Sequence, residues 1–299
     1  MTKTMSYYPG CSSQATGVHL DTSLRSVMGK LGIQFRDIED WNCCGASVGH
    51  ICAGNTPVAA LSGRNLANAR AAGPEDVVTP CAACYLNTHA VNEEIRDHPD
   101  VAADVNEALG VVGKSYDGSL LVRHACEVLV NDIGLDAIKQ KVTRPLTGLK
   151  VAGWVGCQTV RPFANTERGG KWETYDDPKF LDDFTRAAGA EAVPFKGKTK
   201  CCGGSVAVMS PDKTLGLMKD ILDEVKASGA DVVSTPCPLC QTNLEMYQPA
   251  INKKYGTDFN FPVVFYTQLL AVAMGLDAAK DAGLNQHLIP PEPVLARAK

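Results

Sequence analysis

Short apolar runs alternate with longer amphipathic stretches along the 299-residue chain. The apolar runs resemble strands, whereas the stretches 61–72, 83–95, 213–227 and 239–250 have the spacing of helices. Strands that alternate with helices in this way favour βαβ units and a parallel sheet. The pattern therefore predicts an α/β fold.

The second half of the chain repeats the first in the order of its strand-like runs and turn glycines. Residues 7–11 correspond to 153–157, residues 43–47 to 201–205 and residues 76–81 to 231–237, while 122–136 and 263–277 both end in Gly-Leu-Asp. Such self-similarity indicates internal duplication. We therefore predict two duplicated Rossmann-like α/β halves with parallel sheets, related by a pseudo-twofold axis.

The halves divide near residues 143–148, where Pro145 and Gly148 interrupt regular structure ahead of the apolar run 149–155. The predicted domains are 1–147 and 148–299. With 45% apolar residues, the chain can fill two cores, each in a domain of about 150 residues.

Ten of the twelve cysteines form one pattern written twice: a leading cysteine, a vicinal pair and a C-x-x-C. The gaps between these parts are 31 and 36 residues in the first half, and 43 and 34 in the second. The first set is Cys11, Cys43, Cys44, Cys81 and Cys84, and the second set is Cys157, Cys201, Cys202, Cys237 and Cys240.

Four of these cysteines follow closely on predicted strands, namely Cys11, Cys81, Cys157 and Cys237. Ligands of open α/β sheets gather at the carboxyl ends of strands, so the thiols of one half can meet there. Gly45 and Gly203 follow the vicinal pairs. Glycine permits positive φ and a close approach of the backbone to a bulky inorganic group.

Thiols in this number favour an iron–sulfur site, because iron–sulfur clusters are held by cysteine thiolates. The two members of a C-x-x-C can reach one metal centre across a single turn. Vicinal side chains diverge and suit different irons of one cluster. Zinc is the alternative, and five thiols per half exceed the four ligands of a structural zinc site.

The other chemistry-bearing residues are fewer. Cys52 and Cys126 have no counterpart in the opposite half and are predicted to be packed apolar side chains. His50 and His124 lie near cysteines in the sequence and are candidate proton donors, with a packed or exposed neutral histidine as the alternative.

Composition narrows the classes of function. A net charge of −4 and a pI near 5.9, without a basic tract, argue against a nucleic-acid partner. No apolar run reaches the roughly 20 residues of a membrane span, and residues 1–10 lack the features of a signal peptide. We expect a cytoplasmic protein, where cysteines are more often metal ligands or catalytic than disulfide-bonded.

The doubled cysteine pattern resembles the CCG, or cysteine-rich, domain of the heterodisulfide reductase B subunit family. The similarity runs from residues 7–11 through 127–134 and 235–240 to 265–270. It implies that each five-cysteine set holds a non-cubane 4Fe-4S cluster and that a disulfide is cleaved between the two clusters. The longer gap in the second half places an insertion within 166–178.

The resemblance also implies partners: a C-type subunit with ferredoxin-type clusters and an A-type flavoprotein subunit. We therefore expect the iron–sulfur catalytic subunit of a heterodisulfide reductase-like complex, an oxidoreductase that interconverts a disulfide and thiols or handles sulfane sulfur on a carrier. The alternative is a non-catalytic electron-relay subunit of a dehydrogenase complex of the lactate, glycolate or quinone type. The substrate and the direction of the reaction stay open.

Overall fold

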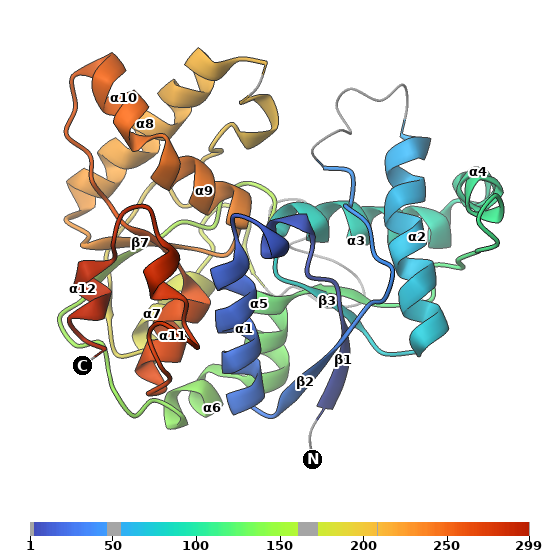
Figure 1. Ribbon diagram of the computed structural model, residues 1–299, viewed down its shortest axis with the longest axis horizontal. Helices are drawn as coiled ribbons and strands as arrows, with labels where there is room; N and C mark the ends of the chain where they lie inside the picture. Colours follow the sequence, from blue (N-terminus) through green and yellow to red (C-terminus); the bar gives the residue numbers. More distant parts are fainter. Residues whose placement is uncertain (1–2, 47–54, 161–172, 208, 299) are drawn as a thin grey trace.

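The computed structural model describes residues 3–46, 55–160, 173–207 and 209–298 (Figure 1). These ranges contain two four-stranded parallel sheets, one in each half. The first has the order β2 (Ile33–Asp37), β1 (Lys3–Tyr7), β3 (Val77–Thr79) and β4 (Val122–His124). The second has the order β6 (Glu191–Ala192), β5 (Lys150–Gly153), β7 (Val232–Thr235) and β8 (Val263–Phe265). The shared order confirms the predicted duplicated α/β fold.

The strand order of each sheet defines one place where a ligand site is expected. The chain passes from β1 to the edge strand β2 and then returns to the other side of β1 to form β3; β5, β6 and β7 repeat this path. The strand order therefore reverses between β1 and β3, and between β5 and β7. Ligand sites of open α/β sheets form at the carboxyl ends of strands at such a reversal.

Helices connect the strands. In the first half they are the 3-10 helix η1 (Cys11–Gln14), α1 (Val18–Lys30), α2 (Thr56–Ala72), α3 (Ala82–Asp97), α4 (Pro99–Gly110), α5 (Ala125–Val128), the π-helical turn η3 (Leu129–Ile133) and α6 (Leu135–Gln140). In the second half they are α7 (Phe180–Ala187), the 3-10 helix η4 (Gly204–Val206), α8 (Pro211–Ser228), α9 (Pro238–Met246), α10 (Gln248–Tyr255), α11 (Tyr266–Ala273), the 3-10 helix η5 (Leu284–Gln286) and α12 (Glu292–Leu295).

Three of the four predicted helices are single helices, and the fourth prediction is wrong. The stretch 239–250 is divided between α9 and α10, which meet at Tyr247. Pro249 lies in the first turn of α10, where its missing N–H is tolerated, whereas inside a continuous helix it would remove a hydrogen bond and clash with the preceding turn. The apolar periodicity continues across this break, which is why the pattern predicted one helix.

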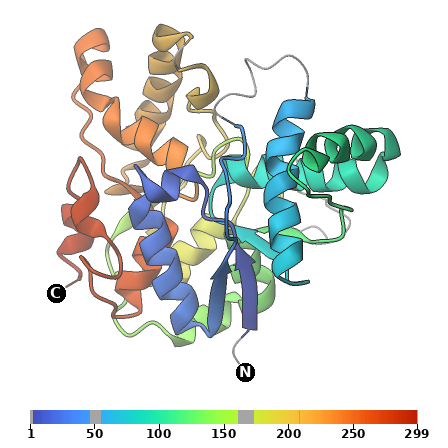
Figure 2. The same cartoon turned by 45° about the vertical axis from the view of Figure 1, so that its right-hand side comes forward.

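The halves share a core in addition to the core of each half. Leu24 and Val27 of α1, Cys126 of α5, and Leu269 and Leu270 of α11 belong to one buried cluster. In Figures 1 and 2 the blue helix α1 lies between strands β1 and β2 and the red C-terminal helices. The composition suggested two cores, and the packing adds this third one between the halves. The domain boundary at 147/148 stays a proposal.

The interface between the halves is formed by helices from the beginning and the end of each half. Helix α1, which follows β1, packs on α11 of the second half, and the Ser23 and Thr267 hydroxyls lie 2.6 Å apart there. Helix α7, which follows β5, packs on α6 of the first half. The helix after the first strand of each half therefore contacts a helix near the end of the other half, although α6 and α11 do not hold equivalent positions in the repeat.

Arg123 of β4 is the centre of a buried group of charges. Its side chain is 8% exposed and donates to Asp132 Oδ1 at 2.7 Å and to Glu127 Oε1 at 3.1 Å. Asp76, which precedes β3, lies 3.5 Å from the same guanidinium. Burial raises the pKa of Glu127, and the charge of Arg123 opposes that rise. The ion group ties β4 to the turn that follows it.

Within the described ranges, no helix combines the length and the apolar composition needed to cross a bilayer.

Candidate metal centre

The cysteines gather where the strand order reverses. In the first half, Cys11 follows β1, and Cys81 follows β3 as the residue that precedes α3. In the second half, Cys157 follows β5, and Cys237 follows β7 in the same position before α9. Both switch points therefore carry the thiols that the strand pattern placed there.

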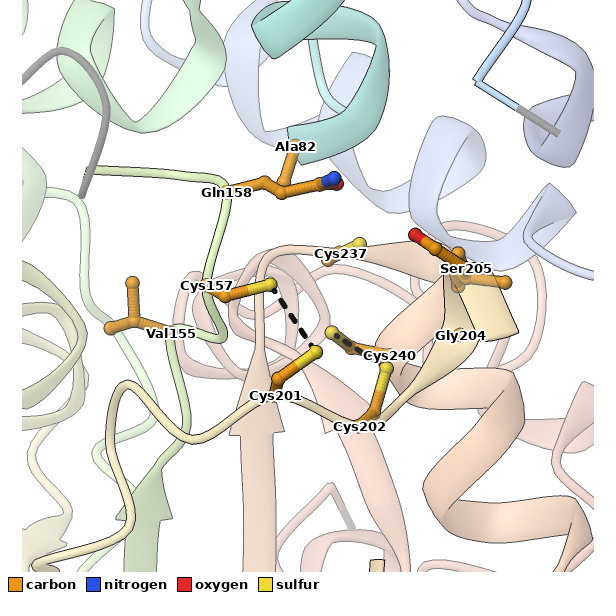
Figure 3. A pocket seen from close by; sticks show the side chains of 11 residues that line it. Ala82, Val155, Cys157, Gln158, Cys201, Cys202, Gly204, Ser205, Cys237 and Cys240 are labelled. Atoms are coloured by element: carbon orange, nitrogen blue, oxygen red, sulfur yellow. Dashed lines mark hydrogen bonds between the residues drawn. The ribbon is translucent and has the colours of Figure 1, made fainter. Parts of the chain in front are cut away.

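Within each set, the vicinal cysteines contact different thiols. Cys43 Sγ lies 3.8 Å from Cys11 Sγ, whereas Cys44 hydrogen-bonds with the thiol of Cys84. The second set repeats the arrangement, with 3.7 Å between the sulfurs of Cys157 and Cys201, and 3.7 Å between those of Cys202 and Cys240 (Figure 3). The vicinal thiols of the second half thus have separate partners, whereas in the first half Cys43 and Cys44 also hydrogen-bond with each other.

The sulfur spacing is compatible with metal. Two thiolates that bind one tetrahedral metal through bonds of about 2.3 Å stand about 3.8 Å apart. The sulfur–sulfur separations of 3.7 and 3.8 Å in the two sets agree with that distance. Five thiols in each set also exceed the four of a simple cubane. The donor chemistry and the pairwise spacing are therefore compatible with iron–sulfur ligation, while no three of the described ligand-type side chains already surround one metal position.

The two sets meet across the interface between the halves. The thiol of Cys81 hydrogen-bonds with that of Cys237, and these residues hold equivalent positions at the start of α3 and α9. Both are buried. A group bound by one set would therefore lie beside a group bound by the other.

Some thiols are held near the thiolate state by their neighbours. Hydrogen bonds from Cys43 and Cys84 lower the pKa of Cys44, and a hydrogen bond from Cys240 lowers the pKa of Cys202. Hydrogen bonds from Cys240 and Cys81 likewise lower the pKa of Cys237. Because the thiolate is the form that binds metal, these sites are favourable for ligation.

Two glycines shape the centre at equivalent positions. Gly10 and Gly156, each before a leading cysteine, have φ of 74° and 75°. A Cβ at Gly10 would lie 2.7 Å from Cys84 Sγ, and one at Gly156 would lie 3.1 Å from Cys240 Sγ. Only glycine combines this left-handed backbone with room for the thiol beside it.

Gly10→Ala is expected to destabilise the protein more than Gly32→Ala. Both positions have positive φ, but nothing lies within 4 Å of a Cβ at Gly32. Each substitution should lose roughly 1–2 kcal/mol from backbone strain. The displacement of Cys84 should add roughly 1–3 kcal/mol at Gly10. Urea denaturation under anaerobic conditions measures the difference, and equal losses would contradict the contact with the thiol.

The glycines after the vicinal pairs lie against helices. Gly45 and Gly203 have φ of 84° and 75°, as expected for residues that free the backbone. A Cβ at Gly45 would lie 3.2 Å from Val58 of α2, and one at Gly203 would lie 3.1 Å from Leu217 of α8. The backbone at these two glycines therefore lies close to the helices that flank the thiols.

Two asparagines at the thiols were not predicted from the sequence. Asn243 Nδ2 donates to Cys202 Sγ at 3.5 Å. In the first half, Asn87 Nδ2 donates to Cys44 Sγ at 3.8 Å and to the Cys44 carbonyl at 3.1 Å. The signal for them is present in the sequence, because each C-x-x-C extends to C-x-x-C-x-x-N.

A cavity of about 410 Å³ lies between the halves on the side of the first set. Its described lining from the first half is Cys11, Ser12, Cys43, Cys44, Ala46, Cys81, Ala83 and Cys84, and from the second half Gln158, Gly204, Ser205, Met209 and Leu239. The second set faces a space of about 20 Å³, drawn in Figure 3, in which Gln158 and Ala82 lie above Cys157 and Cys237. Such a space has room for about one water molecule.

The candidate proton donors have different outcomes. His124 is buried, and its Nδ1 accepts a hydrogen bond from the Cys126 N–H. Burial lowers the pKa of His124 to about 4, while Cys237 across the interface acts in the opposite direction. The imidazole is therefore neutral near pH 7 and close to a thiol, and its role as a proton donor stays a prediction. His50 lies outside the described residues.

The two cysteines outside the repeated pattern, Cys52 and Cys126, were predicted to be packing residues. Cys126 is buried in the shared core, where it hydrogen-bonds with Tyr266 and burial raises its pKa. Cys52 lies outside the described residues, as does most of the predicted insertion within 166–178.

Comparison with known families places the cysteine pattern in context. The profile of the CCG family, described as a cysteine-rich domain, matches the chain twice, over residues 5–88 and 151–245. Each match contains one complete set of five cysteines.

Several characterised proteins are similar over nearly the whole chain. The 8-methylmenaquinol:fumarate reductase membrane anchor subunit of Wolinella succinogenes is 32% identical over 97% of this chain and 98% of that protein. The B subunit of the ferredoxin/F(420)H(2)-dependent CoB-CoM heterodisulfide reductase of Methanosarcina acetivorans is 30% identical over 95% of this chain and 93% of its own. A protein of Archaeoglobus profundus, named as similar to the heterodisulfide reductase B subunit, is 30% identical over 92% of each.

A solved structure shares the fold. A hypothetical protein from Helicobacter pylori superposes with a TM-score of 0.73 at 17% identity, covering 96% of this chain and 52% of that one. At this level of identity the likeness concerns the fold alone.

Proposed function

Because this chain belongs to the cysteine-rich CCG domain family, we propose that it is the iron–sulfur subunit of a reductase complex and interconverts a disulfide and thiols, or handles sulfane sulfur. The observation that carries the proposal is the meeting of two complete five-thiol sets at the interface between the halves. A scaffold for two separate structural metals would not require Cys81 and Cys237 to be in contact.

The proposed ligands are the ten cysteines of the two sets. Cys11, Cys43, Cys44, Cys81 and Cys84 would hold one non-cubane 4Fe-4S cluster, and Cys157, Cys201, Cys202, Cys237 and Cys240 would hold the other. When bound, the clusters supply electrons one at a time and iron sites for sulfur. In the described structure, Cys44 and Cys202 are each buried and hydrogen-bonded by an asparagine.

The residues of the chain position the reaction. Walls from both halves enclose the 410 Å³ cavity beside the first set, so a substrate there is partly removed from water. Cleavage of a disulfide takes two electrons and two protons and gives two thiols; oxidation of thiols runs the same balance in reverse. The electrons pass between this subunit and a redox partner, and the neutral imidazole of His124 is the described candidate for passing a proton near the interface.

Partners follow from the proposed reaction. The relatives are named as subunits of larger enzymes. We propose that this chain assembles with a C-type subunit carrying ferredoxin-type clusters, because it has no ferredoxin-type cysteine run of its own. An A-type flavoprotein subunit completes the proposed complex, which we place in the cytoplasm. A small thiol or disulfide, or a sulfur carrier, is the proposed substrate.

A second candidate is a non-catalytic electron relay. The observation in its favour is the 32% identity to a subunit of a quinol:fumarate reductase. A relay needs its two clusters only within electron-transfer reach of each other. A change in the cluster spectra of the isolated subunit on addition of a thiol favours the catalytic function, and an unchanged spectrum favours the relay.

Anaerobically purified protein is expected to contain about eight irons and about eight acid-labile sulfides per chain, from two four-iron clusters. Iron and sulfide analysis, with EPR of the reduced and oxidised protein, checks this. About one zinc per half without labile sulfide would refute the proposed function.

A further inference from the structure

The part of the cavity wall that the structure describes is neutral. Apart from the thiols of the first set, its described lining consists of small or apolar side chains and of the hydroxyl and amide groups of Ser12, Ser205 and Gln158. No Asp, Glu, Lys, Arg or His occurs among the described lining residues. The described lining residues offer no cation to a carboxylate, sulfonate or phosphate, and burial of an unpaired charge carries a large free-energy cost.

The walls also differ in bulk at equivalent positions. Ala83 lies between the cysteines of the first C-x-x-C, and Leu239 occupies that position in the second. Ser12 follows the leading cysteine of the first set, and Gln158 follows that of the second. The first set opens onto about 410 Å³, whereas the second has about 20 Å³. A molecule in the cavity therefore contacts the first set and lies against Leu239 and Gln158.

Resting on the proposed function, we infer that the cavity binds a thiol or disulfide whose sulfur-bearing end is uncharged and mainly apolar. Its carbon skeleton packs against Leu239 and Met209, and a hydroxyl, carbonyl or amide of the substrate hydrogen-bonds with Gln158. The cluster that the first set would hold takes up the part of the cavity nearest those thiols, and the sulfur of the substrate faces that part.

A matched pair of probes tests this inference. Mercaptopropanol and mercaptopropanesulfonate have the same thiol and chain length and differ in charge. Each is titrated into the anaerobic, cluster-loaded full-length protein, with the EPR signal as the measure of binding. We expect half-saturation at a concentration at least about tenfold lower for the alcohol, because the sulfonate must be desolvated without a partner. Equal or tighter binding of the sulfonate overturns the inference.

A charge placed at the mouth of the cavity sharpens the test. Met209 lines the cavity and is 63% exposed, so Met209→Arg should fold and should lower the half-saturation concentration of the sulfonate several-fold at low salt. Met246→Arg adds the same charge outside the cavity lining and should leave it unchanged. Equal effects of the two variants overturn the inference. Iron and sulfide content report separately on the proposed function.

An independent observation concerns the two asparagines. Asn87 and Asn243 hold equivalent positions, and each donates its amide N–H to the buried vicinal cysteine of its own half. A hydrogen bond to a thiolate withdraws electron density from sulfur, and such bonds are among the factors that set the potential of a cluster. The repetition of the contact in both halves points to a shared purpose.

We propose that Asn87 and Asn243 are positioning residues that raise the reduction potential of the cluster in their own half. Asn243→Leu keeps a similar volume and removes the donor. At a fixed potential, the ratio of reduced to oxidised second cluster should fall by about tenfold, which is 59 mV for one electron. EPR-monitored redox titration measures it, and Asn106→Leu, which replaces an amide that binds the Tyr116 backbone, is the control.

Two outcomes overturn the role of these asparagines. One is an unchanged midpoint potential in Asn243→Leu protein that retains its iron. If that variant loses iron, Asn243→Gln, which keeps the amide on a longer side chain, should retain the cluster at a shifted potential. Loss of iron from both variants is the other outcome, since it would make Asn243 a structural support alone.

Discussion

Cys202→Ser is expected to remove about half of the iron and labile sulfide from the protein, because one of the two proposed four-iron clusters would lose a ligand. Cys202 is buried and contacts both Cys240 and Asn243, so no other cysteine can take over its role as a ligand unless the surrounding structure rearranges. The remaining iron should belong to the first set. Iron analysis and EPR of the variant beside the parent protein measure the loss.

Cys126→Ala is the matched control, since Cys126 is also buried but packs in the shared core. It should keep its full iron content and lose roughly 1–2 kcal/mol of unfolding free energy. If Cys126→Ala alone abolished a cluster, the division of the cysteines into ligands and packing residues would be wrong. Cys44→Ser should reproduce the effect of Cys202→Ser in the first half.

Arg123→Met is expected to cost roughly 3–5 kcal/mol of unfolding free energy, because it leaves Glu127 buried without its cation. Glu127 is 5% exposed on its side chain, and its pKa is already raised by burial. Without Arg123 that pKa rises further, so the folded state binds a proton more readily than the unfolded state. The deficit should therefore shrink as the pH falls from about 7 to about 5, in urea denaturation at each pH.

Two variants control for the loss of an arginine. Arg186 is 57% exposed and pairs with Asp183 on the surface of α7, so Arg186→Met should cost at most about 1 kcal/mol. Adding Glu127→Leu to Arg123→Met should recover part of the loss, because the uncompensated carboxylate is removed. A loss in Arg123→Met as small as that in Arg186→Met would show that the buried ion group contributes little.

The duplicated sheets and the position of the thiols were predictable because they depend on local signals. Strand-like runs such as 76–80 and 231–236 end directly before Cys81 and Cys237, and parallel strands bring their carboxyl ends to one edge. The break at Tyr247 was also predictable in principle from Pro249. The helical periodicity on both sides concealed it.

The packing between the halves was predicted only in outline, because the family resemblance implied that the two cysteine sets face each other without saying which residues meet. Contact between Cys81 and Cys237 requires the halves to dock with both C-x-x-C turns at the interface. That docking depends on apolar side chains of α1, α7 and α11. The sequence of each helix shows which of its faces is apolar, but it does not show which other helix packs against that face. The asparagine contacts were predictable in part. The sequence shows an asparagine three residues after each C-x-x-C, but it does not show that the side chain donates to the buried vicinal cysteine.

The reciprocal packing of α1 on α11 and of α7 on α6 bears on the history of the chain. A half-length ancestor with this interface could form a homodimer, and in it every substitution would alter both walls of the cavity at once. Gene duplication and fusion remove that constraint. Ala83 and Leu239, or Ser12 and Gln158, are pairs that one gene encoding a symmetric dimer could not have produced. Covalent linkage would thus let the side of the first set specialise in admitting a molecule while the side of the second set stays closed.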